Sequence, residues 1–356
     1  MKTVYLGRYS NSELLTGPEK VAERIFTEHS RNNESEFITY FFDGRKYGIW
    51  KKIFGHEAVS EKGKGRVVRS GVLACLLRLI SIRPDNIHII NFERFAAVAL
   101  VYKLFFGARV IYTVHGIAAY ENEHFKSVNG SYKKRDKRIE SALFKYSDRV
   151  VFLSEQSLQL AEDVYRIDSS KCTILPNGID IEFHNLNEMD VTSPTLSIVF
   201  SGNVKRREKG FAELQKLFSN EKLPASLFVI NSGLTGEEGS ITYLESMTTK
   251  ELADFISEKH IFISASLYEP FSLSAVEAMA SGLAVIASTK TGMSRYIVNG
   301  VNGFIYDISE PKQIAVLIKT LNDDRGLLRS VSFEAKKIIA VLSWDKVYEQ
   351  YKELYK

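Results

Sequence analysis

The sequence predicts an α/β protein built from two doubly wound domains in series, each with a mainly parallel sheet between helices. Three observations predict this class. Short apolar runs alternate with longer amphipathic ones along all 356 residues, a pattern typical of strand–helix–strand units. That length corresponds to about two domains. A polar, aperiodic stretch that closes with a proline, residues 180–194, separates the two series of runs.

In the first half, the short apolar runs predict strands and the longer runs predict helices. We expect the strands at Thr3–Leu6, Phe37–Phe42, Ile87–Asn91, Val110–Val114, Arg149–Leu153 and Thr173–Leu175. We expect the helices at Pro18–Glu28, Gly71–Ile82, Phe95–Phe106, Lys133–Tyr146 and Gln156–Tyr165. This alternation predicts that successive strands lie parallel and are joined by crossover helices.

The second half repeats the pattern. Its expected strands are Leu196–Ser201, Ser226–Asn231, Ile261–Ser264, Ala284–Ala287 and Gly303–Tyr306, and its expected helices are Lys209–Leu217, Thr249–Ser257, Ser274–Ser281 and Pro311–Leu321. We place an N-terminal domain at 1–188 and a C-terminal domain at 189–340. The tail, 341–356, carries aromatic residues at helical spacing, and we expect it to pack back on the first domain.

Composition excludes several classes of protein. With 45% hydrophobic and 25% charged residues, the chain is an ordinary globular one and not a disordered or disulfide-stapled one. Cys75 and Cys172 lie far apart with no CxxC partner, so neither a zinc site nor a disulfide framework is indicated. The most apolar stretch, 95–117, is interrupted by charged residues, which favours a buried helix and strand over a membrane span. We therefore expect a cytoplasmic protein.

The strongest local signal for chemistry runs from Glu269 to Ser288 and predicts a strand, a loop, a helix that opens near Ser272 and a second strand. Amides at a helix start lack partners and carry partial positive charge, so they can hold a phosphate. Glu269 precedes this anion site, and Glu277 lies one turn into the helix. Two such carboxylates can bind the hydroxyls that flank a diphosphate. The alternative interpretation is a capping box formed by Ser274 and Glu277, with Glu269 in a solvated loop.

This stretch resembles the Glu-x7-Glu motif of retaining glycosyltransferases of the GT-B fold, family 4 (glycosyl transferases group 1). Other segments resemble landmarks of that family in the same order, and together they span nearly the whole chain. They are the glycine loop at 15–20, His115–Gly116, Val151–Glu155, Leu175–Asp180, Ser201–Gly210, Thr291–Gly303 and the final helix at Trp344–Tyr355.

The resemblance implies two Rossmann-like domains that face a cleft, the first for the acceptor and the second for a nucleotide sugar. It implies a front-face reaction in which the acceptor hydroxyl enters on the side from which the diphosphate leaves. The catalytic residues it implies are Glu269, His115 and Lys209. The donor-binding residues it implies are Gly17, Arg206, Lys209, Phe271, Ser272, Leu273 and Glu277.

We expect no metal and no cofactor besides the nucleotide-sugar substrate. The sequence contains no Asp-x-Asp pair, so basic side chains and the helix start must offset the charge of the leaving group.

Three departures from the family pattern bear on the donor. Asn203 stands where an arginine usually follows Gly202, which leaves Lys205, Arg206 or Arg207 as the second phosphate cation. Ser272 stands where a glycine is common. Arg295 stands where relatives are often acidic.

Three further features are assigned from their sequence context. His115 ends an apolar strand and is followed by a glycine, and we expect it to hydrogen-bond the transferring sugar or the acceptor. His88 lies inside a strand and is expected in the core. The run Lys126–Arg138 has six basic residues and one acidic residue. It forms either a solvated helix face or a contact with anionic lipid or a lipid-diphosphate acceptor. Nucleic acid is disfavoured because Tyr132 is the only aromatic in the run, so interleaved aromatics that could stack on bases are lacking.

Taken together, the sequence predicts a retaining hexosyltransferase that uses a UDP-sugar and acts in assembly of a cell-surface polysaccharide or glycolipid. It would be cytoplasmic, peripheral on the inner face of the membrane. Two alternatives stay open at this point: a nucleotide-sugar epimerase of the same fold, and a nucleotide-sugar-binding protein without turnover. Product analysis separates the first from a transferase, and binding without consumption identifies the second. A dehydrogenase is disfavoured because no Gly-x-Gly-x-x-Gly follows a strand.

Overall fold

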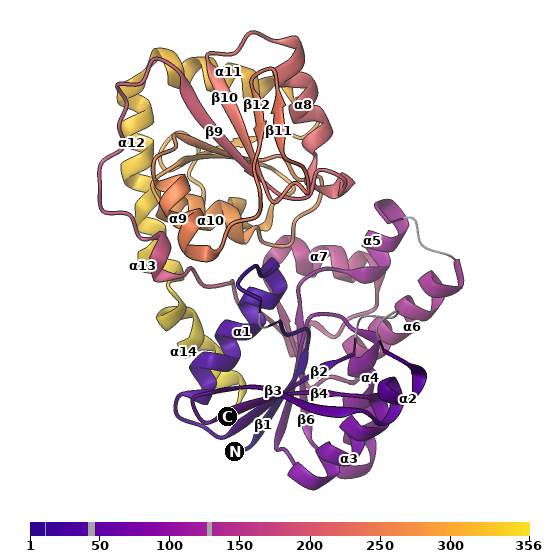
Figure 1. The fold of residues 1–356 in the computed structure, drawn as a ribbon. Coiled ribbons are helices and arrows are strands. Elements are labelled where there is room, and N and C mark those ends of the chain that lie inside the picture. The colour runs from indigo at the N-terminus through magenta and orange to yellow at the C-terminus, as the bar shows by residue number, and fades with distance from the viewer. Residues whose placement is uncertain (11, 42–46, 127–129) are drawn as a thin grey trace. The chain divides into compact units, whose positions relative to one another are not determined.

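A computed structural model describes residues 1–10, 12–41, 47–126 and 130–356. The chain forms two compact units, one of residues 1–176 with 347–356 and one of residues 177–346 (Figure 1). Residues 177–188 group with the second unit, since Asn185 Nδ2 donates to the carbonyls of Ser281 (3.2 Å) and Ser257 (3.5 Å). The binding roles given above to the two domains stay predictions.

Unit 1 is built on an eight-stranded sheet in the order β3-β4-β2-β1-β5-β6-β7-β8. All neighbours are parallel except β3 and β4, which form an antiparallel pair at one edge. The strands are β1 (Thr3–Gly7), β2 (Ser35–Tyr40), β3 (His56–Lys62), β4 (Gly65–Ser70), β5 (Asn86–Ile90), β6 (Arg109–Val114), β7 (Arg149–Phe152) and β8 (Cys172–Ile174).

The helices of unit 1 lie close to the predicted ranges, with two additions, α2 and α5. They are α1 (Gly17–Ser30), α2 (Ile49–Phe54), α3 (Val72–Ile82), α4 (Ala97–Phe106), α5 (Ala118–His124), α6 (Gly130–Tyr146) and α7 (Glu155–Val164), with short 3-10 turns η1 (Arg94–Ala96) and η2 (Ser169–Lys171). The β3–β4 hairpin was also not predicted, because its strands mix charged and apolar residues without a buried run. Residue Phe42 of one predicted strand lies outside the described residues.

Unit 2 has a seven-stranded sheet in the order β11-β12-β10-β9-β13-β14-β15, parallel except for the short edge pair β11–β12. Its strands are β9 (Leu196–Ser201), β10 (Ala225–Ile230), β11 (Gly236–Glu238), β12 (Ile241–Tyr243), β13 (Ile261–Ser264), β14 (Ala284–Ser288) and β15 (Phe304–Tyr306). The edge pair was not predicted, since each of its strands has only three residues.

The helices of unit 2 are α8 (Phe211–Asn220), α9 (Thr249–Ser257), α10 (Leu273–Ala280), α11 (Lys312–Asp323), α12 (Arg325–Ala335) and α13 (Ile339–Leu342), with 3-10 turns η3 (Ile181–Phe183), η4 (Arg207–Lys209), η5 (Gly292–Tyr296) and η6 (Lys336–Ile338). Alternate residues of β9, such as Ile198 and Phe200, join α8 and α11 in one buried apolar cluster. Helix α10 packs on β13 and β14.

The two segments that join unit 2 to the rest of the chain lie side by side. Ile179 N donates to Leu342 O (2.7 Å), and Ile179 pairs with Ser343 as a parallel bridge. A Cβ on Gly178 would come within 2.4 Å of the Trp344 ring. The glycine in the Pro-Asn-Gly stretch is therefore required because an indole covers its backbone.

The last helix, α14 (Trp344–Leu354), carries tyrosines into the core of unit 1. His88 on β5 contacts the Tyr355 hydroxyl through Nδ1 (2.8 Å) and the Thr113 hydroxyl through Nε2 (2.7 Å). His29 on α1 contacts the Tyr348 hydroxyl (2.9 Å). His88 is thus a satisfied core residue, as predicted, and two neutral imidazoles fix the position of the last turns of the chain.

These imidazoles predict a loss of stability in acid. Burial, and then the nearby His115 and His29, lower the pKa of His88 from 6.5 to about 3. Burial, and then the chain's amino terminus, lower the pKa of His29 to about 4. Because both values are depressed, the neutral rings stabilise the fold fully above pH 6.5, and this stability is lost as the pH falls toward 3–4.

Between about pH 7 and pH 5 we expect the free energy of unfolding of unit 1 to fall by roughly 2 kcal/mol per histidine. Urea unfolding, with hydrogen exchange of α14 as the local probe, measures this loss. The variant His88→Gln should lose less than the parent, while His124→Gln, which alters an exposed histidine, should behave as the parent does. An equal acid loss in His88→Gln would contradict the assignment.

Candidate active site

Unit 2 has its topological switch point between β9 and β13. Within the sheet, β9 has β10, the next strand along the chain, as its neighbour on one side and β13 as its neighbour on the other. In open α/β sheets, ligands bind outside the carboxyl ends of the strands at this point. The loops that follow the two strands, 202–210 and 265–272, therefore mark the expected binding place.

A glycine holds these two loops in contact. Gly210 has φ +71°, and a Cβ on it would lie 1.8 Å from the Ala265 carbonyl oxygen. Two residues before Gly210, the carbonyl of Glu208 accepts a hydrogen bond from Leu267 N (2.8 Å). No side chain other than hydrogen fits at position 210 without moving backbone. The close approach fixes how the residues beside Gly210 face the second loop.

Lys209 and Glu269 meet across this contact. The Lys209 ammonium forms an ion pair with Glu269 Oε2, and both side chains are mostly buried. Ser266 Oγ lies 3.5 Å from the same oxygen. The backbone of Glu269 is held on its other side, donating to Lys290 O (3.1 Å) and accepting from Gly292 N (2.8 Å). Two of the predicted catalytic residues are thus brought together as one rigid pair.

Hydrogen bonds of buried hydroxyl groups connect the loops after β13 and β14. Ser288 Oγ donates to Ser266 O (2.6 Å) and lies 3.2 Å from the Thr291 hydroxyl, which in turn lies 3.3 Å from Ser264 Oγ. All four residues are buried. Small polar residues in strands carry no distinctive sequence pattern, so sequence reasoning missed this cluster, although the serines at the ends of β13 and β14 were a usable signal.

Helix α10 opens beside the pair without a side-chain cap. Ser272 is its N-cap residue, with φ +78° and no cap hydrogen bond from its side chain. The capping-box interpretation of Ser274 and Glu277 is wrong, because the helix begins at Leu273 and Ser274 is already its second residue. Glu277 is buried within α10. The first amides of the helix are therefore left for a ligand or for solvent.

The neighbouring residues Phe271 and Leu273 frame this helix start. Phe271 is buried, its carbonyl accepts from Met293 N (2.8 Å), and its ring lies edge-on to Tyr296 at 6.3 Å between centroids. The backbone from 269 to 273 is thereby pinned to the segment after β14. This holds the α10 amides in one orientation.

The loop after β9 shows what the departure at Asn203 does. Asn203 Oδ1 accepts from Lys205 N (2.9 Å) and its carbonyl accepts from Arg206 N (3.0 Å), so the asparagine builds a turn. Arg206 Nε donates to the buried Glu208 at 2.7 Å. Lys205 and Arg207 are exposed. Of the three candidate cations, Arg206 is the one whose side chain is held by an ion pair with Glu208, next to Lys209 in the same loop.

In unit 1, His115 follows β6. Its Nε2 is closed to solvent and has no hydrogen-bond partner among the residues the structure describes. Burial lowers its pKa to about 4, so the imidazole is neutral near pH 7, and Nε2 donates or accepts one hydrogen bond according to the tautomer. Gly17, the other predicted residue here, is exposed at the start of α1, and no atom lies within 4 Å of where its Cβ would be.

Unit 1 also holds charged pairs that sequence reasoning missed. Its switch point lies between β1 and β5, and there Arg8 Nε lies 2.5 Å from Glu93 Oε1. Next to it, Arg94 makes a two-point contact with the buried Asp136, at 2.5 and 3.0 Å. Arg8 follows β1, Glu93 and Arg94 follow β5, and Asp136 lies on α6. These pairings depend on the order of the strands in the sheet, so the sequence alone did not predict them.

Comparison with known proteins agrees with this architecture. The family model described as "Glycosyl transferases group 1" matches residues 193–338, and the model described as "Glycosyltransferase Family 4" matches residues 17–183. Together they account for most of the chain.

The chain is a glycosyltransferase, whose C-terminal half matches the group 1 model and whose N-terminal half matches the family 4 model. A UDP-Gal:alpha-D-GlcNAc-diphosphoundecaprenol alpha-1,3-galactosyltransferase of Escherichia coli is 25% identical over 269 residues, which are 69% of this chain and 68% of the relative. This glycosyltransferase also superposes on solved structures. Sucrose-phosphate synthase of Thermosynechococcus elongatus matches with a TM-score of 0.79 at 16% identity, covering 100% of this chain and 98% of that one. Anabaena HepE, solved with UDP-glucose, matches at 0.78 and 17%, covering 100% and 99%. The predicted GT-B fold is confirmed.

The conformation of Ser272 in this glycosyltransferase yields a stability prediction. An L-residue at φ +78° is strained, whereas glycine adopts this conformation readily. Ser272→Gly should therefore raise the free energy of unfolding by roughly 0.5–1 kcal/mol. The same change two residues on, Ser274→Gly, lies inside α10 and should lower it by roughly 0.5 kcal/mol, because glycine has a weaker helix propensity than serine. Thermal unfolding of the two variants measures both effects, and a loss of stability in Ser272→Gly would contradict the strained backbone.

Proposed function

We propose that this glycosyltransferase moves a hexosyl group from a UDP-sugar to a hydroxyl of a glycan or lipid-linked acceptor, with retention and without a metal. The observation that carries the proposal is the Lys209–Glu269 pair beside the uncapped start of α10. It places one cation, one carboxylate and a row of amides at the switch point of unit 2. Those groups complement a diphosphate joined to a sugar.

The names of similar proteins support the choice of donor and acceptor. The Escherichia coli relative takes UDP-Gal and acts on a sugar linked to diphosphoundecaprenol. The Anabaena structure contains UDP-glucose. We extend both features to this chain, a uridine diphosphate donor and an acceptor carried on lipid, and with them a place in cell-surface polysaccharide assembly.

Each group in unit 2 then has one task. The amides from Ser272 onward, flanked by Phe271 and Leu273, hold the diphosphate. One N–H of the Lys209 ammonium donates to Glu269, and the other two donate to phosphate oxygens. Glu269 uses the oxygen that Lys209 does not contact to orient the sugar, and Glu277 holds the ribose. Arg206, anchored by Glu208, supplies the second positive charge.

The reaction needs no nucleophile from the protein. The bond from the acceptor oxygen to the anomeric carbon forms on the face from which the diphosphate leaves, and the acceptor proton passes to a diphosphate oxygen. Lys209, Arg206 and the α10 amides stabilise the charge that develops on the leaving group. His115, neutral because burial lowers its pKa, hydrogen-bonds the sugar or the acceptor. Gly17 lets the backbone at the start of α1 approach the diphosphate.

A donor screen tests this function. Thermal unfolding is measured with UDP-, GDP- and ADP-sugars, and UDP-glucose or UDP-galactose should raise the Tm most, because binding to the folded state stabilises it. Transfer to an undecaprenyl-diphosphate sugar is then followed by proton NMR, and the product should keep the α configuration of the donor.

Three outcomes contradict the proposal in different ways. A β-linked product would overturn retention. An isomerised nucleotide sugar formed without any acceptor would identify an epimerase. A rise in Tm with no consumption of donor under any acceptor would identify a binding protein without turnover.

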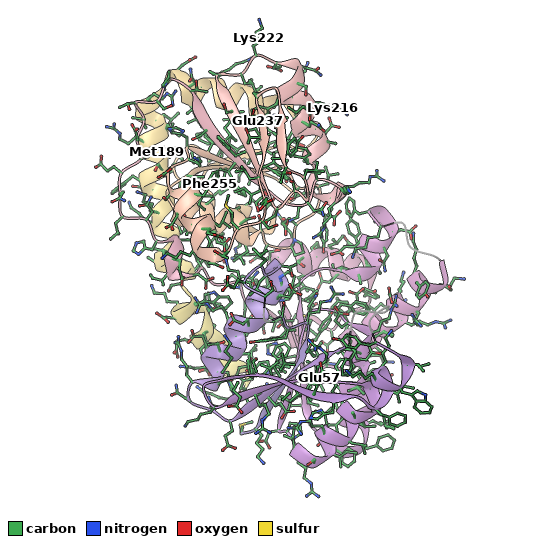
Figure 2. The ribbon with its side chains drawn as sticks, viewed as in Figure 1. Glu57, Met189, Lys216, Lys222, Glu237 and Phe255 are labelled. Carbon is green, nitrogen blue, oxygen red and sulfur yellow. The ribbon has the colours of Figure 1, made fainter. Side chains whose placement is uncertain are left out.

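The role of Lys209 is tested by a matched pair of lysine variants. Lys209→Ala should lower kcat by about 10²–10³-fold, as expected when one preorganised charge on a leaving group is lost. Lys216→Ala, on the exposed surface of α8 (Figure 2), should leave kcat unchanged. Circular dichroism checks that both variants fold. Full activity in Lys209→Ala would contradict the proposed role.

We extend the proposal to location, namely a cytoplasmic enzyme held at the inner face of the membrane. The basic run Lys126–Arg138 supports this, although residues 127–129 lie outside the described residues. On α6 the side chains of Lys134, Lys137 and Arg138 are exposed. Lys126 pairs with Glu121 and Lys133 with Glu123. Exposed cations in this number favour anionic headgroups.

A further inference from the structure

Three neighbouring helices of unit 1 each expose several large apolar side chains. Helix α3 packs between α2 and α4, and Figure 1 shows the three together at the lower right of unit 1. We call their outward side chains the apolar face. It consists of Ile49, Trp50 and Phe54 on α2, Val72, Leu73 and Leu77 on α3, and Val101, Leu104, Phe105 and Phe106 on α4.

The apolar face is not a by-product of core packing. The inner sides of α3 and α4 already supply the core, through residues such as Leu79 on α3 and Tyr102 on α4. The outward positions of α4, Val101, Leu104 and Phe105, recur at helical spacing. A helix that is apolar on every side is normally buried. Single exposed apolar residues are common, but a patch across three helices marks a surface that binds something.

Charge decides what that partner is. Helices α2, α3 and α4 contain no aspartate or glutamate. Their basic residues are largely compensated, since Lys51 pairs with Glu57, Arg78 with Glu36 and Lys103 with Asp148. Helix α6 packs on α4 and adds exposed cations to the surface of unit 1. The surface thus has an apolar centre and a basic flank.

An anionic lipid layer fits this arrangement better than a second copy of the chain does. Apolar side chains at the headgroup boundary, with lysines and arginines against the headgroups, are what an interfacial membrane surface requires. A second copy would present the same three helices, which contain no aspartate or glutamate to complement the cations of α6. No helix in the described part of the chain is long and apolar enough to span a bilayer.

We propose that the apolar face of α2, α3 and α4 embeds in the interfacial region of an anionic bilayer, while α6 lies against the headgroups. This deepens the membrane location proposed above and rests on it only for the choice of membrane. Attachment needs neither donor nor acceptor, so it is measured without glycosyl transfer. The two proposals can therefore fail separately.

The chain carries its own probe of insertion. Trp50 is 74% exposed on the apolar face, whereas Trp344 is 5% exposed. Vesicles of phosphatidylglycerol and phosphatidylcholine in a 1:3 ratio, chosen as about one anionic lipid in four, are added to the full chain. The protein should float with the vesicles, and the tryptophan emission should shift to the blue. The variant Trp50→Phe should bind but show no shift.

A matched pair of variants locates the contact. Leu104→Asn/Phe105→Asn should lower the vesicle partition coefficient at least about tenfold, because two apolar groups no longer leave water. Phe333→Asn, on α12 of unit 2, removes an aromatic ring of similar exposure (63% against 72% for Phe105) and should bind as the parent does. The Tm rise with UDP-glucose, unchanged in the double variant, shows that its fold and donor site are intact.

Several results would overturn the proposal. One is equal flotation of the double variant and the parent. Another is equal flotation on vesicles of phosphatidylcholine alone, which would remove the anionic lipid. A third is a concentration-dependent dimer in sedimentation, abolished by the double variant, which would assign the apolar face to a second copy of the chain.

Discussion

The contact between the Gly210 backbone and the Ala265 carbonyl is the constraint on which the candidate active site depends. It brings the loop after β9 against the loop after β13, at the switch point of unit 2 between these two strands. Lys209 comes directly before that glycine, and Glu269 follows four residues after the alanine. With the loops this close, a lysine and a glutamate that are sixty positions apart form one buried pair.

Such a pair solves an electrostatic problem for an enzyme that must bind an anion. A mostly buried ammonium with no partner would lose much of its hydration, whereas Glu269 compensates it before any ligand arrives. The carboxylate also fixes the direction of the Lys209 side chain. The cost of orienting the charge is therefore met during folding, which is what preorganised stabilisation of a leaving group requires. In the other unit, burial keeps His115 neutral, which suits hydrogen bonding to hydroxyl groups.

The sequence predicted the parts of the fold that have a strong hydrophobic period. The buried central strands β9 and β13 and the amphipathic helix α9 have the predicted bounds. The edge pairs β3–β4 and β11–β12 were missed, since they are short or mix charge with apolar residues. In the site, Lys209 and Glu269 could be named from motifs, but their pairing could not. It depends on strand order and on the positive φ of Gly210, and neither leaves a local pattern. The cluster of Ser264, Ser288 and Thr291 is hidden for the same reason.

The most direct test of the central claim is a crystal structure of the full chain with an intact UDP-sugar. The account predicts that the diphosphate lies within hydrogen-bond distance of the amides from Ser272 to Ser274 and of Lys209 Nζ, with the sugar hydroxyls at Glu269 and the ribose at Glu277. A diphosphate bound elsewhere in the protein, with the Lys209–Glu269 pair facing solvent, would contradict it.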